Sequence, residues 1–140
     1  MKLSVVVIVY YPRISEIHKN ISEYIDLVEN VIIWDNTPSD GFTTCENLFT
    51  SLNSKIIYLS DGVNKGIGYA LNQAVLWSLQ RGFTHIMTMD QDSLFKRNDF
   101  LKLIESVNDL KENCNIGIIS PNIINLFSKK LLPLYESKTK

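Results

Sequence analysis

Five apolar runs separated by amphipathic stretches constrain the fold of this 140-residue chain more than any other feature. The runs cover residues 3–9, 31–34, 55–59, 83–89 and 116–120. The first is continuously apolar, as expected of a strand covered on both faces. Apolar residues recur at helical spacing over residues 14–28, 44–52 and 67–80, and again from Asn98 or Asp99 to about residue 110. This alternation predicts an α/β fold with a mostly parallel open sheet and helices on both faces.

The charge balance of the chain argues against nucleic acid as a partner. Fourteen basic and fifteen acidic residues give a net charge of -1, without any block of like charges, so we expect no nucleic-acid binding.

The apolar run near the N-terminus lacks a signal-peptide cleavage site and is too short to span a bilayer. We therefore expect a buried strand and a cytoplasmic protein.

The two cysteines, Cys45 and Cys114, lie far apart and lack CxxC spacing or nearby histidines. This pattern supports neither a disulfide framework nor a zinc site. We expect two free thiols in a reducing compartment.

Ligands of open parallel sheets bind at the carboxyl ends of the strands, so the residues that follow each strand are the candidates. Asp90 and Asp92 follow the fourth run and, two residues apart in extended chain, can face one ligand. Two carboxylates suit Mg²⁺ or Mn²⁺ bound jointly with phosphates. The alternative is a solvated acidic turn, and the spacing does not decide between them.

Two further segments end at the same predicted edge. Asp35 follows the second run and could accept the ring N–H of uracil or thymine, which cytosine lacks; the same residues also favour a simple turn. Residues 64–68 lead into a helix, and their glycines permit close approach of an anionic ligand. Their spacing matches neither a Walker loop nor the GxGxxG fingerprint.

Taken together and in this order, four segments resemble the family 2 glycosyltransferases, and most of all their rhamnosyltransferase-like members. The resemblance extends from about residue 3 to residue 122. The segments that carry it are Val5-Val6-Val7-Ile8-Val9-Tyr10-Tyr11-Pro12, Trp34-Asp35-Asn36-Thr37, residues 64–72 from Asn64 to Asn72, and Met89-Asp90-Gln91-Asp92-Ser93.

The resemblance implies a GT-A fold whose Rossmann-like half binds a nucleotide-diphosphate sugar, with dTDP-rhamnose or a UDP-sugar as candidates. It further implies Mn²⁺ or Mg²⁺ as cofactor and specific roles for single residues. Tyr10 and Tyr11 would lie beside the base, Asp35 would bind it, Asn64 and Gly66 would line the nucleotide pocket, Asp90 would approach ribose and metal, and Asp92 would ligate the metal.

By the same resemblance the reaction inverts the anomeric carbon and transfers the sugar to a glycan or lipid-linked acceptor, as in polysaccharide biosynthesis at the inner face of the membrane. We interpret residues 1–125 as the donor-binding domain, and residues 126–140 as a tail or the start of a missing acceptor-binding half. The catalytic base stays unassigned, because the later acidic residues do not match the family by context: Glu105, Asp109, Glu112 and Glu136.

Other functions remain as alternatives. A non-catalytic module that binds nucleotide sugars would show nucleotide binding without sugar transfer. A sugar nucleotidyltransferase would carry a glycine-rich basic loop after the first strand, where Tyr10-Tyr11-Pro12-Arg13 stands. A receiver domain would carry an acidic pair there. Residues 126–134 are the apolar segment that we expect to promote homo-oligomers or aggregation.

Overall fold

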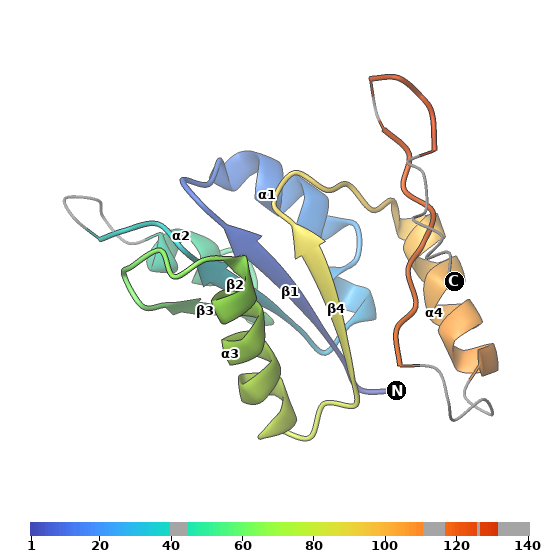
Figure 1. Cartoon of the computed structure of the whole chain (residues 1–140), viewed down its shortest axis with the longest axis horizontal. Helices are drawn as coiled ribbons and strands as arrows, with labels where there is room; N and C mark the ends of the chain where they lie inside the picture. The colour runs from blue at the N-terminus through green and yellow to red at the C-terminus, as the bar shows by residue number, and fades with distance from the viewer. Residues whose placement is uncertain (40–44, 111–116, 126, 132–140) are drawn as a thin grey trace, which may run out of the picture. The chain divides into compact units, whose positions relative to one another are not determined.

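The computed structural model describes residues 1–39, 45–110, 117–125 and 127–131, and its central feature is a four-stranded parallel sheet (Figure 1). The strands are β1 (Leu3–Val9), β2 (Asn30–Asp35), β3 (Ile56–Ser60) and β4 (His85–Asp90), in the spatial order β3-β2-β1-β4. Every pairing is parallel. The predicted α/β fold with an open parallel sheet is therefore confirmed.

Burial follows position in the sheet. The central strands β1 and β2 are almost completely buried, whereas the edge strands β3 and β4 are partly exposed. This difference explains why the first run is continuously apolar, since both of its faces are covered.

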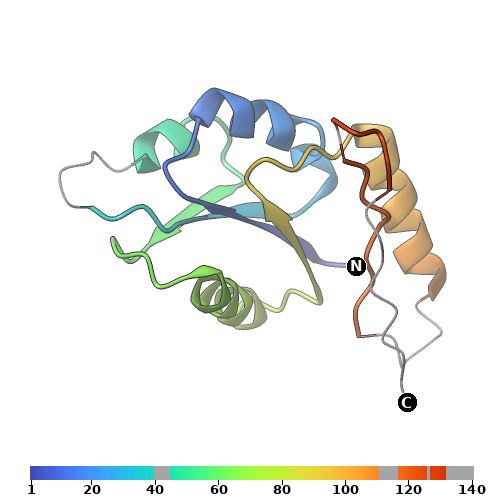
Figure 2. The same cartoon turned by 45° about the horizontal axis from the view of Figure 1, so that its top comes forward.

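Helices cover both faces of the sheet, with α1 (Ile14–Ser22) and α2 (Glu46–Thr50) on one side and α3 (Ile67–Leu79) on the other (Figure 2). Ala74 of α3 packs in a buried cluster with Val6 and Ile32, and Trp77 lies partly buried against it. Leu79, the last residue of α3, is 58% exposed, because the buried face of the helix continues from Ala74 to Ser78.

The predicted helix over residues 14–28 is wrong in its second half. Helix α1 ends at Ser22, and Tyr24 leaves the helical region with φ −138° before the short 3₁₀ helix η1 (Ile25–Leu27). The Tyr24 ring is buried and stacks on Phe100 of α4 (Arg97–Asp109), with ring centroids 4.9 Å apart. Packing of this ring therefore overrides the helical periodicity.

Helix α4 begins one or two residues earlier than the helical spacing predicts. Its first residue is Arg97, whose backbone N–H donates to Glu23 Oε2 at 3.2 Å. Asp99 consequently lies inside the first turn, where a carboxylate interacts favourably with the helix dipole.

The fifth predicted strand is not formed by residues 117–120, which have no regular structure, and Ile116 lies outside the described residues. A short apolar run needs a pairing partner to become a strand, and here Ile118 is 90% exposed. The chain divides into two compact units, Met1–Lys102 and Leu103–Lys140. The described part of the second unit contains one antiparallel bridge, between Ile124 and Leu131.

Some expectations fall wholly or partly outside the described residues. These are the thiol of Cys114, Glu112, Glu136, the start of the 44–52 helix, and residues 126 and 132–134 of the apolar segment. In the described part of that segment Phe127 is 98% exposed. Among the described residues, no helix has the length and hydropathy needed to cross a membrane.

The core is tested by shortening the same side chain at a buried and at an exposed position. Ile32→Ala removes a fully buried side chain from the Val6–Ala74 cluster and is expected to cost about 2–5 kcal/mol of unfolding free energy. The matched control Ile118→Ala should change stability by less than about 0.5 kcal/mol. Denaturant unfolding measures both, and equal effects would contradict this description of the core.

Candidate functional site

All four strands end beside one another at the carboxyl edge of the sheet. The register pairs Val9 of β1 with Asp35 of β2, and Asp35 with Ser60 of β3. On the other side of β1, Ile8 pairs with Asp90 of β4. The end of β1 therefore lies between Asp35 and Asp90.

Asp35 is a buried carboxylate with a hydrogen-bond donor on each oxygen. Asp35 as a whole residue is only 3% exposed. The Thr37 backbone N–H donates to Oδ1 and the Tyr58 hydroxyl donates to Oδ2, both at 2.8 Å. Because a carboxylate has about four acceptor positions, Asp35 retains capacity for a further donor.

The environment of Asp35 keeps two neighbouring groups protonated. Burial, followed by the hydrogen bond and charge of Asp35, raises the pKa of Tyr58 well above its ordinary value. Burial and then the charge of Asp35 also raise the pKa of the Cys45 thiol. At neutral pH Tyr58 is therefore a hydrogen-bond donor, and Cys45 is a neutral thiol with little nucleophilic character.

A pocket of about 560 Å³ opens beside Asp35, within the size range of small-molecule sites. It combines aromatic walls with hydroxyl and carboxylate groups from the ends of β2 and β3 and from the loops that follow. The lining residues are Tyr11, Pro12, Asp35, Thr37, Pro38, Ser39, Cys45, Glu46, Tyr58, Leu59, Ser60 and Gly62.

The turn after β1 is held by side chains from two other loops. The Tyr10 N–H donates to Gln91 Oε1 and the Tyr11 N–H donates to Thr37 Oγ1, both at 2.8 Å. Tyr11 has φ 48°, in the left-handed region, and its ring meets that of Tyr10 edge to face at 4.5 Å. Both rings remain about half exposed, which leaves aromatic surface available to a ligand.

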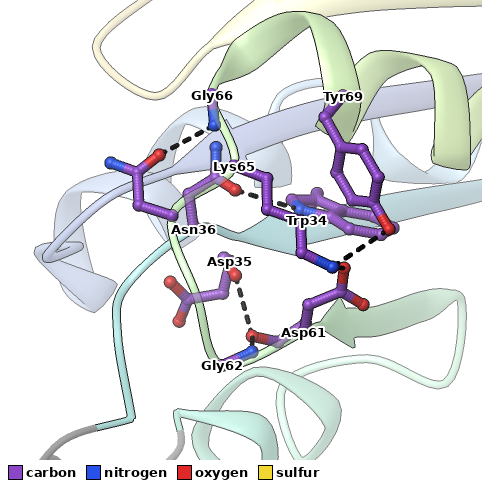
Figure 3. A network of polar contacts seen from close by, with 10 residues as sticks. Trp34, Asp35, Asn36, Asp61, Gly62, Lys65, Gly66 and Tyr69 are labelled. Atoms are coloured by element: carbon purple, nitrogen blue, oxygen red, sulfur yellow. Dashed lines mark hydrogen bonds and ion pairs between the residues drawn. The ribbon is translucent and has the colours of Figure 1, made fainter.

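The loop after β3 is attached to the end of β2 through Ser60, which bonds to the main chain of both Asp35 and Gly62; these two residues lie close together in Figure 3. The Ser60 hydroxyl donates to the Asp35 carbonyl oxygen at 2.8 Å and accepts the Gly62 N–H at 3.1 Å. The Gly62 carbonyl in turn accepts the Ser39 N–H at 2.9 Å. This chain of bonds sets the outer wall of the pocket.

Further along the same loop, a second set of contacts lies around the start of α3 (Figure 3). Lys65 pairs with Asp61 at 2.7 Å and donates to the Tyr69 hydroxyl at 3.3 Å. These contacts lower the pKa of Asp61 and raise that of Lys65, in each case mainly through their mutual hydrogen bond. Asn64 Oδ1 accepts the N–H of Gly66, which has φ 84°.

Asp92 lies at a smaller hollow of about 220 Å³ near the start of α1. Tyr11 lines this hollow as well as the larger pocket, so the two adjoin at that residue. The smaller hollow is lined by Tyr11, Arg13, Glu16, Ile17, Gln91 and Asp92.

Comparison with protein families matches residues 4–139 to glycosyl transferase family 2. The chain belongs to this family. The four-stranded parallel sheet with helices on both faces is consistent with the Rossmann-like GT-A fold that the sequence resemblance implies.

One relative of this family member is the dTDP-rhamnosyl transferase RfbF of Shigella flexneri. The two are 29% identical over 133 residues, which cover 95% of this chain and 42% of the relative. The chain therefore spans less than half of the length of that protein. The rhamnosyltransferase-like resemblance is confirmed at this distant level of identity.

The site residues predicted from the sequence fall into three groups. Tyr11 and Asp35 line the larger pocket, and Asp92 lines the adjoining hollow. Tyr10, Asn64, Gly66 and Asp90 line neither of these two cavities; they lie at the same carboxyl edge or in the loop before α3. Their roles toward nucleotide and metal stay predictions.

Sequence reasoning did not single out Tyr58 or Ser60, which come from β3, nor Gln91 between the two aspartates. Tyr58 is a polar-tipped residue inside an apolar run, and it stands two residues before Ser60. That spacing places both on one face of a strand and was the available signal.

Asp90 and Asp92 carry the carboxylate oxygens that the divalent cation implied by the resemblance prefers, but strand β4 ends at Asp90 and Asp92 stands in the following turn, so the expected extended spacing of the pair is not formed. Both residues are exposed, and none of the ion pairs among the described residues involves either carboxylate. The described residues hold no cluster of three or more His, Cys, Asp or Glu. Two carboxylates that leave other positions to phosphate and water suit Mg²⁺ or Mn²⁺.

The loop after β3 is tested at Gly62, with Gly68 of α3 as the comparison. Gly62→Ala would place a Cβ 2.8 Å from Ser39 Oγ at φ +67°, so it should destabilise the chain by about 1–2 kcal/mol. Gly68→Ala, in open space inside α3, should stabilise it by about 0.5–1 kcal/mol. Denaturant unfolding of both variants checks the opposite signs; a neutral Gly62→Ala would contradict the described loop.

Proposed function

We propose that this chain binds a nucleotide-diphosphate sugar through the pocket beside Asp35, as the donor-binding part of an inverting glycosyltransferase. The observation that carries the proposal is the buried Asp35 carboxylate, which lines a pocket of ligand size together with the aromatic ring of Tyr11. The position at the carboxyl edge of a parallel sheet supports it, because ligands of such sheets bind there.

The chemistry of Asp35 favours a base with a ring N–H. An ionised carboxylate only accepts hydrogen bonds, and uracil, thymine and guanine offer a ring N–H that cytosine lacks. The name of the Shigella flexneri relative makes dTDP-rhamnose the first donor candidate, with UDP-sugars as the alternative. Tyr10 and Tyr11 would flank the base, while Asn64 and Gly66 would approach the nucleotide from the loop before α3.

In the same proposal Asp90 and Asp92 hold Mn²⁺ or Mg²⁺ together with the diphosphate. When bound, the cation would neutralise charge on the nucleoside diphosphate as it leaves. The acceptor would be a glycan or a lipid-linked glycan, reached from the cytoplasmic face of a membrane. A sugar-transfer assay beside nucleotide binding separates this enzyme from a non-catalytic nucleotide-sugar-binding module.

Nucleotide preference tests the role of Asp35. Thermal unfolding with dTDP, UDP, GDP and CDP should show stabilisation by at least one of the first three and less by CDP. A ligand at a hundred times its dissociation constant adds about 2.7 kcal/mol, a shift of several degrees. Asp35→Asn should remove that preference, because an amide cannot accept on both sides.

Each variant is compared with its own nucleotide-free unfolding temperature, so loss of basal stability does not imitate loss of binding. If no nucleotide stabilises the wild-type chain, or if Asp35→Asn keeps the preference, the assignment of the pocket to the base is wrong.

Metal dependence tests the role of Asp92. Stabilisation by the preferred nucleotide should increase with Mn²⁺ in the wild type, and Asp92→Asn should remove that increase. The matched control is Asp109→Asn, which removes one exposed negative charge from α4 and should leave the Mn²⁺ effect unchanged. Equal Mn²⁺ effects in wild type and Asp92→Asn would contradict the metal site.

A further inference from the structure

We propose that Tyr58 is a positioning residue that sets nucleobase selectivity by orienting the carboxylate of Asp35 toward the pocket. This inference rests on the proposed binding of a nucleobase at Asp35. It adds a specificity-determining residue that contributes through Asp35, and it predicts that a single hydroxyl distinguishes bases with a ring N–H from cytosine.

The geometry begins with the register of β3 against β2. Tyr58 and Ser60 stand two residues apart on β3, so their side chains leave the same face of the strand. Tyr58 donates to Asp35 Oδ2 and Ser60 donates to the Asp35 backbone carbonyl, both at 2.8 Å. One strand thus holds both the main chain and the side chain of Asp35.

The two donors on the carboxylate differ in kind. Oδ1 accepts a backbone N–H, that of Thr37, which any residue other than proline would supply. Among the described residues Tyr58 supplies the side-chain hydroxyl that donates to Oδ2. Its orientation of the carboxylate is therefore the part of the arrangement that a change of side chain can remove.

Directional bonding connects this orientation to selectivity. A hydrogen bond weakens steeply when its donor is misaligned with the acceptor lone pair. With one anchor on each oxygen, the remaining lone pairs of Asp35 keep fixed directions, as a ring N–H requires. Cytosine presents no ring N–H at that position, so its binding gains little from the orientation.

Tyr58 also permits a clean substitution. Its ring stacks on that of Phe49, with centroids 6.1 Å apart and planes inclined by 26°, and it forms part of the pocket wall. Tyr58→Phe keeps the ring, its packing and the wall, and removes only the hydroxyl. The raised pKa of Tyr58 means that this hydroxyl is protonated over the whole neutral range.

The experiment measures dissociation constants of dTDP, UDP and CDP by titration calorimetry on the 140-residue chain, for wild type, Tyr58→Phe and Asp35→Asn. Tyr58→Phe should weaken dTDP and UDP by about tenfold, because a reoriented Asp35 carboxylate forms a misaligned hydrogen bond with the ring N–H, and a hydrogen bond to a charged group is worth about that much. CDP should change by less than about twofold. The control Tyr24→Phe removes a hydroxyl from a buried tyrosine that does not line the pocket and should match the wild type.

The outcomes separate the two proposals. Equal weakening of all three nucleotides by Tyr58→Phe would mean a structural role for the hydroxyl and would overturn the inference. Unchanged dTDP and UDP affinity in Tyr58→Phe, with loss in Asp35→Asn, would overturn the inference and leave the base site intact. Absence of nucleotide binding to the wild type, or unchanged selectivity in Asp35→Asn, would overturn the proposed function and the inference with it.

Discussion

Parallel hydrogen bonding of β1 to both β2 and β4 brings the carboxyl ends of these strands to one edge of the sheet. A parallel sheet needs covered faces, and the helices on its two sides supply that cover (Figure 2). Parallel pairing also requires a crossover connection between consecutive strands, which lengthens the chain. The result is that segments far apart in sequence, around Tyr11, Asp35 and Asp92, line adjoining hollows.

At that edge the two kinds of acidic residue are in opposite situations. Asp35 is buried, and a buried charge is stable only when donors compensate for the lost water. Thr37 and Tyr58 supply those donors and also fix its direction. Asp90 and Asp92 are exposed and keep their solvation, which suits groups that would exchange water for a cation and phosphate. A rigid hydrogen-bond acceptor beside carboxylates that can exchange water for a cation is consistent with the proposed nucleotide-sugar site.

Local pattern and tertiary packing contributed unequally to the predictions. The apolar runs located four strands within a few residues, because a buried parallel strand must be apolar on both faces. The same rule failed for residues 117–120, where Ile118 is exposed and no ladder forms in the described chain. The helical periodicity also predicted that the first helix continues past Ser22, whereas the stacking of Tyr24 on Phe100 ends it there. Both failures occur where the outcome depends on a distant partner.

The sequence by itself determined the α/β class, the parallel order implied by alternating elements, the family resemblance, and the choice of Asp35, Asp90 and Asp92 as candidates. Those features depend on periodicity and on residue type at strand ends, which are local properties. Only the tertiary structure showed that Asp35 is buried, and that a hydroxyl from β3 holds one of its oxygens. The reason is physical: the contact joins residues 23 positions apart, and it exists only because β2 and β3 pair in one particular register.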